Sequence, residues 1–318
     1  VMLLLSAGSG LYASGDRFLS AVLFQRGIQI ANASGDIDAA DKRIETAIRL
    51  TPLDTYYRTR AEAALSQLSV LSNRRDLTEE ALRTQFQATL ARAVENGLQA
   101  TKIGANQHLN WMTLGRIYQS VVPLGIEGAY DSSVKAYTRA RELNPTNPAI
   151  DLSLAELELA NDNEEAAREA IGRALDKKQN YTAAIFLLTQ IEVNNGNIAK
   201  AIETAQSGTV IAPNDPVTYF QLGILYYQNK NFKDASATLE RSVTLNPQYA
   251  NARYFLGLSY YELKKTPDAL VQLEQLQKFN PDNQEIKVVL TNLRAGRAPF
   301  ADSALTPPED RNDLPIEE

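Results

Sequence analysis

Apolar and small residues recur along this chain in two-helix blocks that repeat every 34 positions. The segment YFQLGILYYQNKNFKDASATLERSVTLNP (residues 219–247) is followed by YFLGLSYYELKKTPDALVQLEQLQKFNP (residues 254–281), and the two align at that offset. Apolar positions within each block keep a helical spacing. An Asn-Pro pair closes each block, because the residue before proline avoids helical dihedrals. This period predicts a stack of helical hairpins.

Glycines and alanines mark the positions where the two helices of a block should approach each other. Glycine inside a helix costs about 1 kcal/mol relative to alanine, so it is tolerable where a second helix comes too close for a side chain. The glycines concerned are Gly115, Gly223 and Gly257. The residues expected to face them from the second helix are Ala140, Ala235 and Ala269. A single hairpin cannot bury both its faces, so stacking on neighbours must supply the core.

The order of residues in each block resembles the tetratricopeptide repeat (TPR): an aromatic residue, Leu-Gly, Tyr, a small residue, Ala and Pro. The pattern is strongest in residues 111–145 and 213–283. Between them Glu158 and Glu192 replace the tyrosine, which predicts looser packing there. The resemblance covers residues 18–295 and implies an all-α fold, a right-handed TPR solenoid of about seven helical hairpins.

The repeat divides the chain into an apolar N-terminal segment (residues 1–17), the solenoid (18–295) and an acidic, proline-rich tail (296–318). The second hairpin is roughly 19 residues longer than one repeat. This excess predicts a long second helix or an unusual loop, with Thr78 as the helix N-cap. The expected hairpins span residues 18–53, 55–107, 108–147, 148–181, 182–215, 216–249 and 250–283, followed by a capping helix at 284–295.

Charge in this chain is concentrated in the tail. The net charge is −6, and residues 301–318 contribute six carboxylates and one arginine to it, leaving the body close to neutral. Nucleic-acid binding needs clustered Lys and Arg, which this distribution does not provide. We therefore expect protein partners and no nucleic acid.

The sequence offers little material for catalysis or metal binding. It contains no cysteine and a single histidine, His108, in a turn rich in Asn and Gln. Zinc sites and histidine-based acid-base chemistry usually recruit several such side chains. We expect no enzyme, no catalytic or metal-binding residues and no cofactor.

The TPR resemblance implies that the first helix of each hairpin lines a concave groove. Helical spacing points six large apolar residues toward it: Phe220, Ile224, Tyr227, Tyr254, Leu258 and Tyr261. The alternative is that individual members pack between neighbouring first helices. TPRs that clamp a terminal carboxylate place Lys, Arg and Asn on this face, which here carries Leu152, Phe186, Phe220 and Tyr254. We therefore do not expect a carboxylate clamp.

These features predict a non-enzymatic TPR scaffold for protein–protein interaction that assembles with copies of itself. Solenoids have complementary ends, and a contact of this kind repeats into a ring or an open filament. The tail is the expected assembly segment, docking through apolar residues on the aromatic groove of another copy. Those residues are Leu305, Pro307, Pro308, Leu314, Pro315 and Ile316.

The start of the chain supports an alternative. The run VMLLL is either the last turn of a membrane helix or an apolar terminus that packs on the first repeat. It resembles the exit from the last membrane helix into the TPR arm of bacterial O-antigen-ligase-like membrane proteins. That resemblance implies a partner-recruiting arm in surface polysaccharide assembly. An extracytoplasmic location at a bacterial cell surface is expected, with the cytoplasm as the other possibility.

Overall fold

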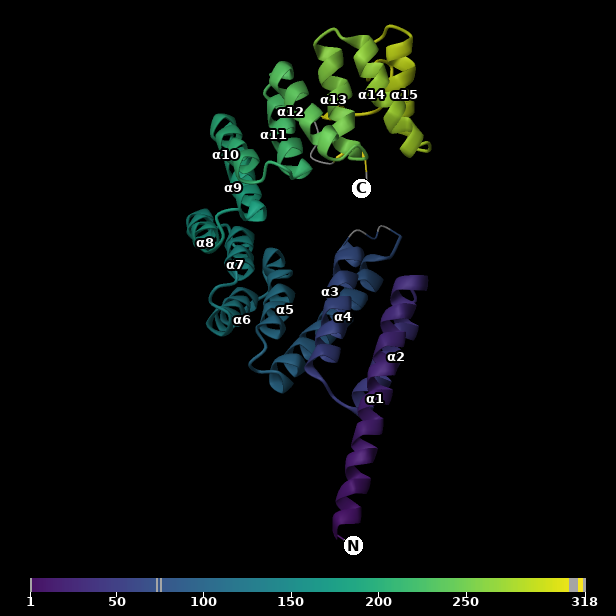
Figure 1. The fold of residues 1–318 in the computed structure, drawn as a ribbon, viewed down its shortest axis with the longest axis vertical. Coiled ribbons are helices and arrows are strands. Elements are labelled where there is room, and N and C mark those ends of the chain that lie inside the picture. Colours follow the sequence, from purple (N-terminus) through teal and green to yellow (C-terminus); the bar gives the residue numbers. More distant parts are fainter. Residues whose placement is uncertain (1, 73, 75, 309–313, 317–318) are drawn as a thin grey trace. The chain divides into compact units, whose positions relative to one another are not determined.

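The structure, a computed structural model, describes residues 2–72, 74, 76–308 and 314–316 (Figure 1). In this part of the chain it has fifteen α-helices, one 3₁₀ turn and no strand. The helices pair into seven hairpins followed by a single helix, so the expected all-α fold class is confirmed. The chain divides into two compact units, Val1–Lys177 and Lys178–Glu318.

Unit 1 contains four hairpins. Within the unit, the second helices α2, α4 and α6 each also pack on the first helix of the next hairpin, as stacking requires. Its helices are α1 (Met2–Ser34), α2 (Ile37–Leu50), α3 (Asp54–Ser72), α4 (Glu79–Ile103), α5 (His108–Gln119), the 3₁₀ turn η1 (Val122–Leu124), α6 (Ala129–Leu143), α7 (Pro148–Ala160) and α8 (Glu164–Lys177).

Unit 2 contains three hairpins, a last helix and the tail. Its largest core cluster is formed by α11 to α15 together with Ile316 of the tail. The helices are α9 (Thr182–Asn194), α10 (Ile198–Ile211), α11 (Pro216–Gln228), α12 (Phe232–Leu245), α13 (Ala250–Glu262), α14 (Thr266–Phe279) and α15 (Gln284–Arg294).

The N-terminal boundary differs from the expected one. We placed the end of an apolar segment at residue 17, but α1 runs without interruption from Met2 to Ser34. Its second half packs on α2, where Ser20 Oγ donates a hydrogen bond to Ala47 O at 2.9 Å. The side chains of residues 1–14 lie outside the described part, so both interpretations of VMLLL stay predictions. None of the described helices combines the length and apolar character that a bilayer crossing requires.

The extra length of the second hairpin lies in its helices. Helix α3 has 19 residues and α4 has 25. Thr78 is the N-cap of α4, as expected, and its hydroxyl accepts a hydrogen bond from Ala81 N at 3.3 Å. The third hairpin (residues 108–147) is also longer than one repeat of 34, and between its helices lie η1 and a loop that turns at Gly125 and Gly128, both with positive φ.

The repeat glycines lie at close helix contacts, as predicted. A Cβ on Gly223 would lie 2.6 Å from Leu239 Cγ, and one on Gly257 would lie 2.9 Å from Leu273 Cγ. Gly115 has the same relation to the Tyr137 ring. Real Cβ contacts are longer than 3.0 Å. The residue that faces each glycine is a large one, Tyr137, Leu239 or Leu273, and not the expected alanine, and the glycine makes room for it.

The predicted loose packing in the middle repeats is not what the structure has at Glu192. This residue is fully buried and its carboxylate lies 2.9 Å from Lys200 Nζ. Glu158 accepts a hydrogen bond from the Tyr130 hydroxyl at 3.0 Å. At these two positions the polar contacts of a glutamate take the place of the packing that the repeat tyrosine would make.

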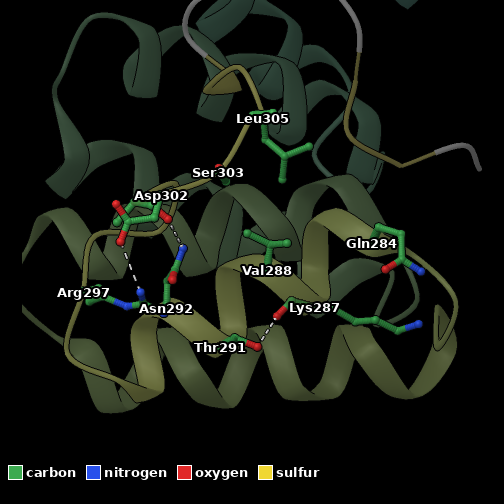
Figure 2. A pocket seen from close by; sticks show the side chains of 11 residues that line it. Gln284, Lys287, Val288, Thr291, Asn292, Arg297, Asp302, Ser303 and Leu305 are labelled. Atoms are coloured by element: carbon green, nitrogen blue, oxygen red, sulfur yellow. Dashed lines mark hydrogen bonds and ion pairs between the residues drawn. The ribbon is translucent and has the colours of Figure 1, made fainter.

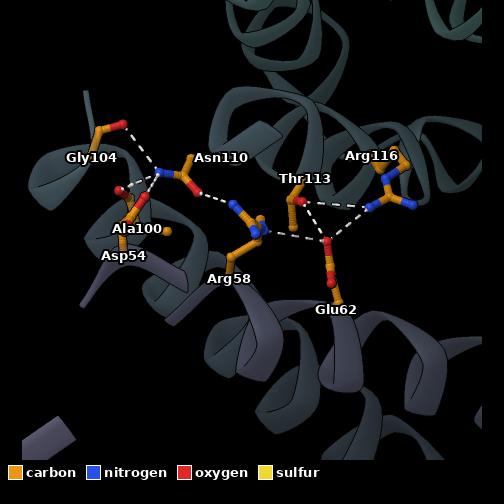
Figure 3. A network of polar contacts seen from close by, with 8 residues as sticks. All are labelled: Asp54, Arg58, Glu62, Ala100, Gly104, Asn110, Thr113 and Arg116. Carbon is orange, nitrogen blue, oxygen red and sulfur yellow. Dashed lines mark hydrogen bonds and ion pairs between the residues drawn. The ribbon is translucent and has the colours of Figure 1, made fainter. Parts of the chain in front are cut away.

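A polar network joins three helices of unit 1 (Figure 3). The buried Asn110 amide of α5 donates to Asp54 Oδ2 at 2.8 Å and to the carbonyl oxygens of Ala100 and Gly104. Its Oδ1 accepts from Arg58 at 3.0 Å. A second branch links Arg58 and Arg116 through Glu62. The network fixes the contact of α3 and α4 with α5.

Replacing Asn110 by Ala is expected to lower the free energy of unfolding of unit 1 by about 2–3 kcal/mol. The change leaves the Asp54 carboxylate and the Arg58 guanidinium without a buried partner, at about 1–3 kcal/mol for each such loss. Urea denaturation followed by circular dichroism measures the effect. The control is Asn106→Ala at an exposed position of the loop before α5. Equal stability of the two variants would contradict a structural role for the network.

Candidate functional site

The six predicted groove residues do not form an exposed aromatic surface. Phe220, Tyr227, Tyr254 and Leu258 are all buried in the core cluster of unit 2. Ile224 and Tyr261 are partly buried against the same cluster. The exposure we expected for the first four is therefore wrong, and the alternative of packing between neighbouring helices describes them better.

Aromatic residues at the N-cap of α13 and within that helix cover Phe220 and Tyr227. The Phe220 ring lies 4.8 Å from that of Tyr249 and 6.2 Å from that of Phe255, measured between centroids. Tyr227 meets Phe255 edge-on at 5.4 Å. The Tyr254 hydroxyl donates to the Glu285 carboxylate of α15. Helix α13 is buried from Ala250 to Ser259.

The tail first folds against α15 (Figure 2). The Asn292 amide donates to Pro299 O at 3.0 Å and to Ala301 O at 2.8 Å. Residues 301–305 and α15 enclose an open hollow of about 430 Å³, which Leu305 helps to line. Some of its polar groups pair with one another, as in the ion pair of Arg297 with Asp302 at 3.2 Å. This hollow has a structural explanation, the attachment of the tail.

The end of the tail docks on unit 2 of the same chain. Asn251 at the start of α13 donates from Nδ2 to Ile316 O at 2.8 Å, and its Oδ1 accepts from Ile316 N at 3.2 Å. Asn283 Nδ2 donates to Pro315 O at 3.3 Å, while its Oδ1 caps α15. Ile316 is only 4% exposed. We call Asn251, Asn283 and the apolar cluster that buries Ile316 the tail seat.

The tail seat holds the described end of the tail chiefly through its main chain. One side-chain amide supplies both a donor and an acceptor to a single residue, as a neighbouring β-strand would. The other described apolar tail residues vary in burial: Pro308 is buried, Leu305, Pro307 and Pro315 are half-buried, and Leu314 is exposed. The acidic residues at 309, 310, 313, 317 and 318 lie outside the described residues.

Sequence reasoning missed Asn251 and Asn283. A usable signal was present for the first: the corresponding positions of the two preceding repeats are Ala183 and Val217. A polar amide at an apolar repeat position needs a partner when it is buried. Asn283 was hidden because an Asn before a helix is commonly only an N-cap.

Other polar clusters in the described part of the chain have structural explanations. Asp151 is fully buried and forms ion pairs with Arg141, Arg173 and Lys177. His108 begins α5, and its ring nitrogen lies 3.3 Å from the Asn144 amide. Among the described residues, no three metal-binding side chains are grouped so that they could hold an ion.

Comparison with known families agrees with the repeat. A family model described as "Tetratricopeptide repeat" matches residues 126–191, and one described as "Anaphase-promoting complex, cyclosome, subunit 3" matches residues 194–276. The chain is a tetratricopeptide-repeat protein. Together the two matches include hairpins of both units of this TPR protein.

Several solved structures are similar to this chain at low sequence identity, and the likeness to the first shows the same fold. Yeast Tom70 is 18% identical, with a TM-score of 0.60 over 89% of this chain and 54% of that one. A tetratricopeptide repeat protein from Parabacteroides merdae is 15% identical, with a TM-score of 0.49 over 86% and 98%. The Cut9–Hcn1 structure of the APC/C is 16% identical, with a TM-score of 0.46 over 87% and 58%. Our TPR chain thus spans little more than half the length of the first and third. No curated protein sequence matches it significantly.

Proposed function

We propose that this TPR protein is a non-enzymatic scaffold that captures extended protein segments at the tail seat. The observation that carries the proposal is the pair of hydrogen bonds between Asn251 and the main chain of Ile316. Main-chain pairing supplies affinity for any extended segment, and an apolar pocket adds selectivity. A proline beside the apolar residue pre-extends the segment and lowers the entropy lost on binding.

A second candidate function, assembly of copies, is supported by the same contact. The tail is a separable segment anchored first at Asn292 and again at its end, at Asn251 and Asn283. The tail of a second copy carries the same residues and fits the same seat. Exchange of tails gives a heterologous contact, which closes into a ring or continues as a filament. This proposal replaces the expected docking on an exposed aromatic groove.

The membrane-protein arm remains an alternative, and so does the extracytoplasmic location. Both rest on the resemblance at the start of the chain. In that setting the tail seat would recruit a partner for a polysaccharide enzyme encoded upstream.

Binding of the tail in trans tests the leading proposal. A chain truncated after Ala301 is expected to bind a synthetic peptide of residues 303–318 with 1:1 stoichiometry in calorimetry. Replacing Asn251 by Ala should weaken this binding about 10- to 100-fold, because it removes two hydrogen bonds worth about 1 kcal/mol each and leaves polar groups unpaired.

The matched control is Gln248→Ala, an exposed amide just before α13. It should leave peptide affinity unchanged. Circular dichroism establishes that each truncated variant is still helical. A helical truncated chain with no affinity for the peptide would rule out the tail seat as a capture site.

A further inference from the structure

A second opening lies beside the tail seat in unit 2. It is a cleft of about 650 Å³ lined by α9, α11, the start of α13 and the tail residues Pro308 and Leu314. This volume lies within the range of about 300–1,000 Å³ that is usual for ligand pockets. Three large apolar side chains of its lining are exposed: Phe186 is 39% exposed, Val217 42% and Leu314 49%. We call it the Phe186 cleft.

The repeat register explains why this cleft is open. Phe186 stands 34 positions before Phe220, and the two occupy equivalent places on α9 and α11. Tyr249 and Phe255 cover Phe220. The residues 34 positions before those two rings are Asp215 and Gln221, which carry no ring. Phe186 therefore lacks the aromatic cover that its counterpart has.

The lining has a definite chemistry. No Asp, Glu, Lys or Arg lies among the described residues of the cleft. Its polar groups include the amides of Gln190, Gln221 and Gln228, and within the described chain no hydrogen bond engages their side chains. An apolar floor with uncharged donors and acceptors suits an extended main chain carrying one large apolar side chain. A charged residue would be desolvated there without a partner.

We propose that the Phe186 cleft binds an extended, uncharged segment of a partner protein, with an aromatic residue placed against Phe186. The cleft is continuous with the contact already made by the tail, because Pro308 and Leu314 form part of its wall. The tail therefore completes this site, and removal of the tail should weaken binding of the partner segment. The inference rests on the proposed capture of extended segments by unit 2, and it adds a second subsite and the chemistry of its occupant.

Methyl NMR on the full chain tests the inference. The probe is acetyl-Gly-Gln-Phe-Pro-Gln-Gly-amide, with versions that carry Ala, Asp or Lys in place of Phe. The Phe probe is expected to shift the methyl signals of Val193, Val217 and Leu314 in a saturable manner. The other versions should bind at least about tenfold more weakly, because burial of a phenyl ring supplies most of the affinity.

Three variants locate the site. Phe186→Ala should weaken the Phe probe about tenfold or more, and Leu314→Ser should weaken it several-fold. The control is Phe279→Ala, at an apolar side chain of α14 that is 58% exposed, and it should have no effect. Phe186 is exposed enough for its replacement to leave the fold intact, which the spectra of the remaining methyl groups verify.

Several results would overturn the inference: equal affinity for the Phe and Ala probes, no effect of Phe186→Ala, or tighter binding after truncation at Ala301. The last would mean that the tail blocks the cleft. If the probe fails while the tail peptide still binds the truncated chain, the cleft is excluded and the tail seat stands. If both peptides fail, the capture function itself is wrong.

Discussion

Gly223→Leu is expected to destabilise unit 2 by about 3 kcal/mol or more, at the upper end of what overpacking costs. Even the first atom of the new side chain would lie 2.6 Å from Leu239 Cγ. Leu239 is fully buried and cannot swing into solvent, so the clash must separate α11 from α12. Gly257→Leu should act in the same way through Leu273. The effect is measured as a lower urea midpoint and as weaker protection of the backbone amides of unit 2 from hydrogen exchange.

A helical glycine in open space provides the control. Gly172 lies in α8, and a Cβ there would meet nothing within 4 Å. Gly172→Leu should be neutral or stabilise by up to about 1 kcal/mol, because leucine is the better helix former. Adding Leu239→Ala to Gly223→Leu should recover part of the loss, since the new side chain takes the vacated volume. A Gly223→Leu variant within about 0.5 kcal/mol of the parent would contradict the close contact.

The 34-residue period was enough to predict most of the fold. Small residues such as Gly223, and Asn-Pro pairs such as that ending at Pro247, report on local constraints that any stacked hairpin must meet. Such constraints are visible in one sequence because they act within a single repeat. The start of α1 was less readable. The apolar run at the start predicts a separate segment, and the structure continues the helix through it.

The burial of the groove residues could not be predicted in the same way. Whether Phe220 faces solvent depends on residues 29 and 35 positions later: Tyr249, the N-cap of α13, and Phe255 within α13. Helical spacing on one helix gives the direction of a side chain but does not say what covers it. The Phe186 cleft is open for the same reason. Asp215 and Gln221, which correspond to Tyr249 and Phe255 one repeat earlier, carry no ring that could cover Phe186. The tail seat depends on contacts across 65 positions, between Asn251 and Ile316.

Mixing two defective chains is expected to reveal whether tails exchange between copies. The first chain ends after Ala301, so it keeps the tail seat and lacks a tail. The second carries Asn251→Leu, so it keeps a tail and lacks the paired hydrogen bonds of the seat. Neither should assemble alone. Together they should form a 1:1 heterodimer, because each supplies the part that the other lacks, and the contact cannot propagate beyond two chains.

Light scattering coupled to size exclusion gives the result directly. The intact chain should show a mass that rises with concentration, and the control Gln248→Leu should behave like it, since that side chain is exposed and only three positions from Asn251. If tails bind only their own chain, the intact protein is a monomer at every concentration and the mixture contains two monomers. If both defective chains assemble alone as well as the intact one, the tail is not the assembly segment. Contacts between the ends of stacked hairpins would then explain association better, because solenoid ends expose the faces that interior repeats bury against each other.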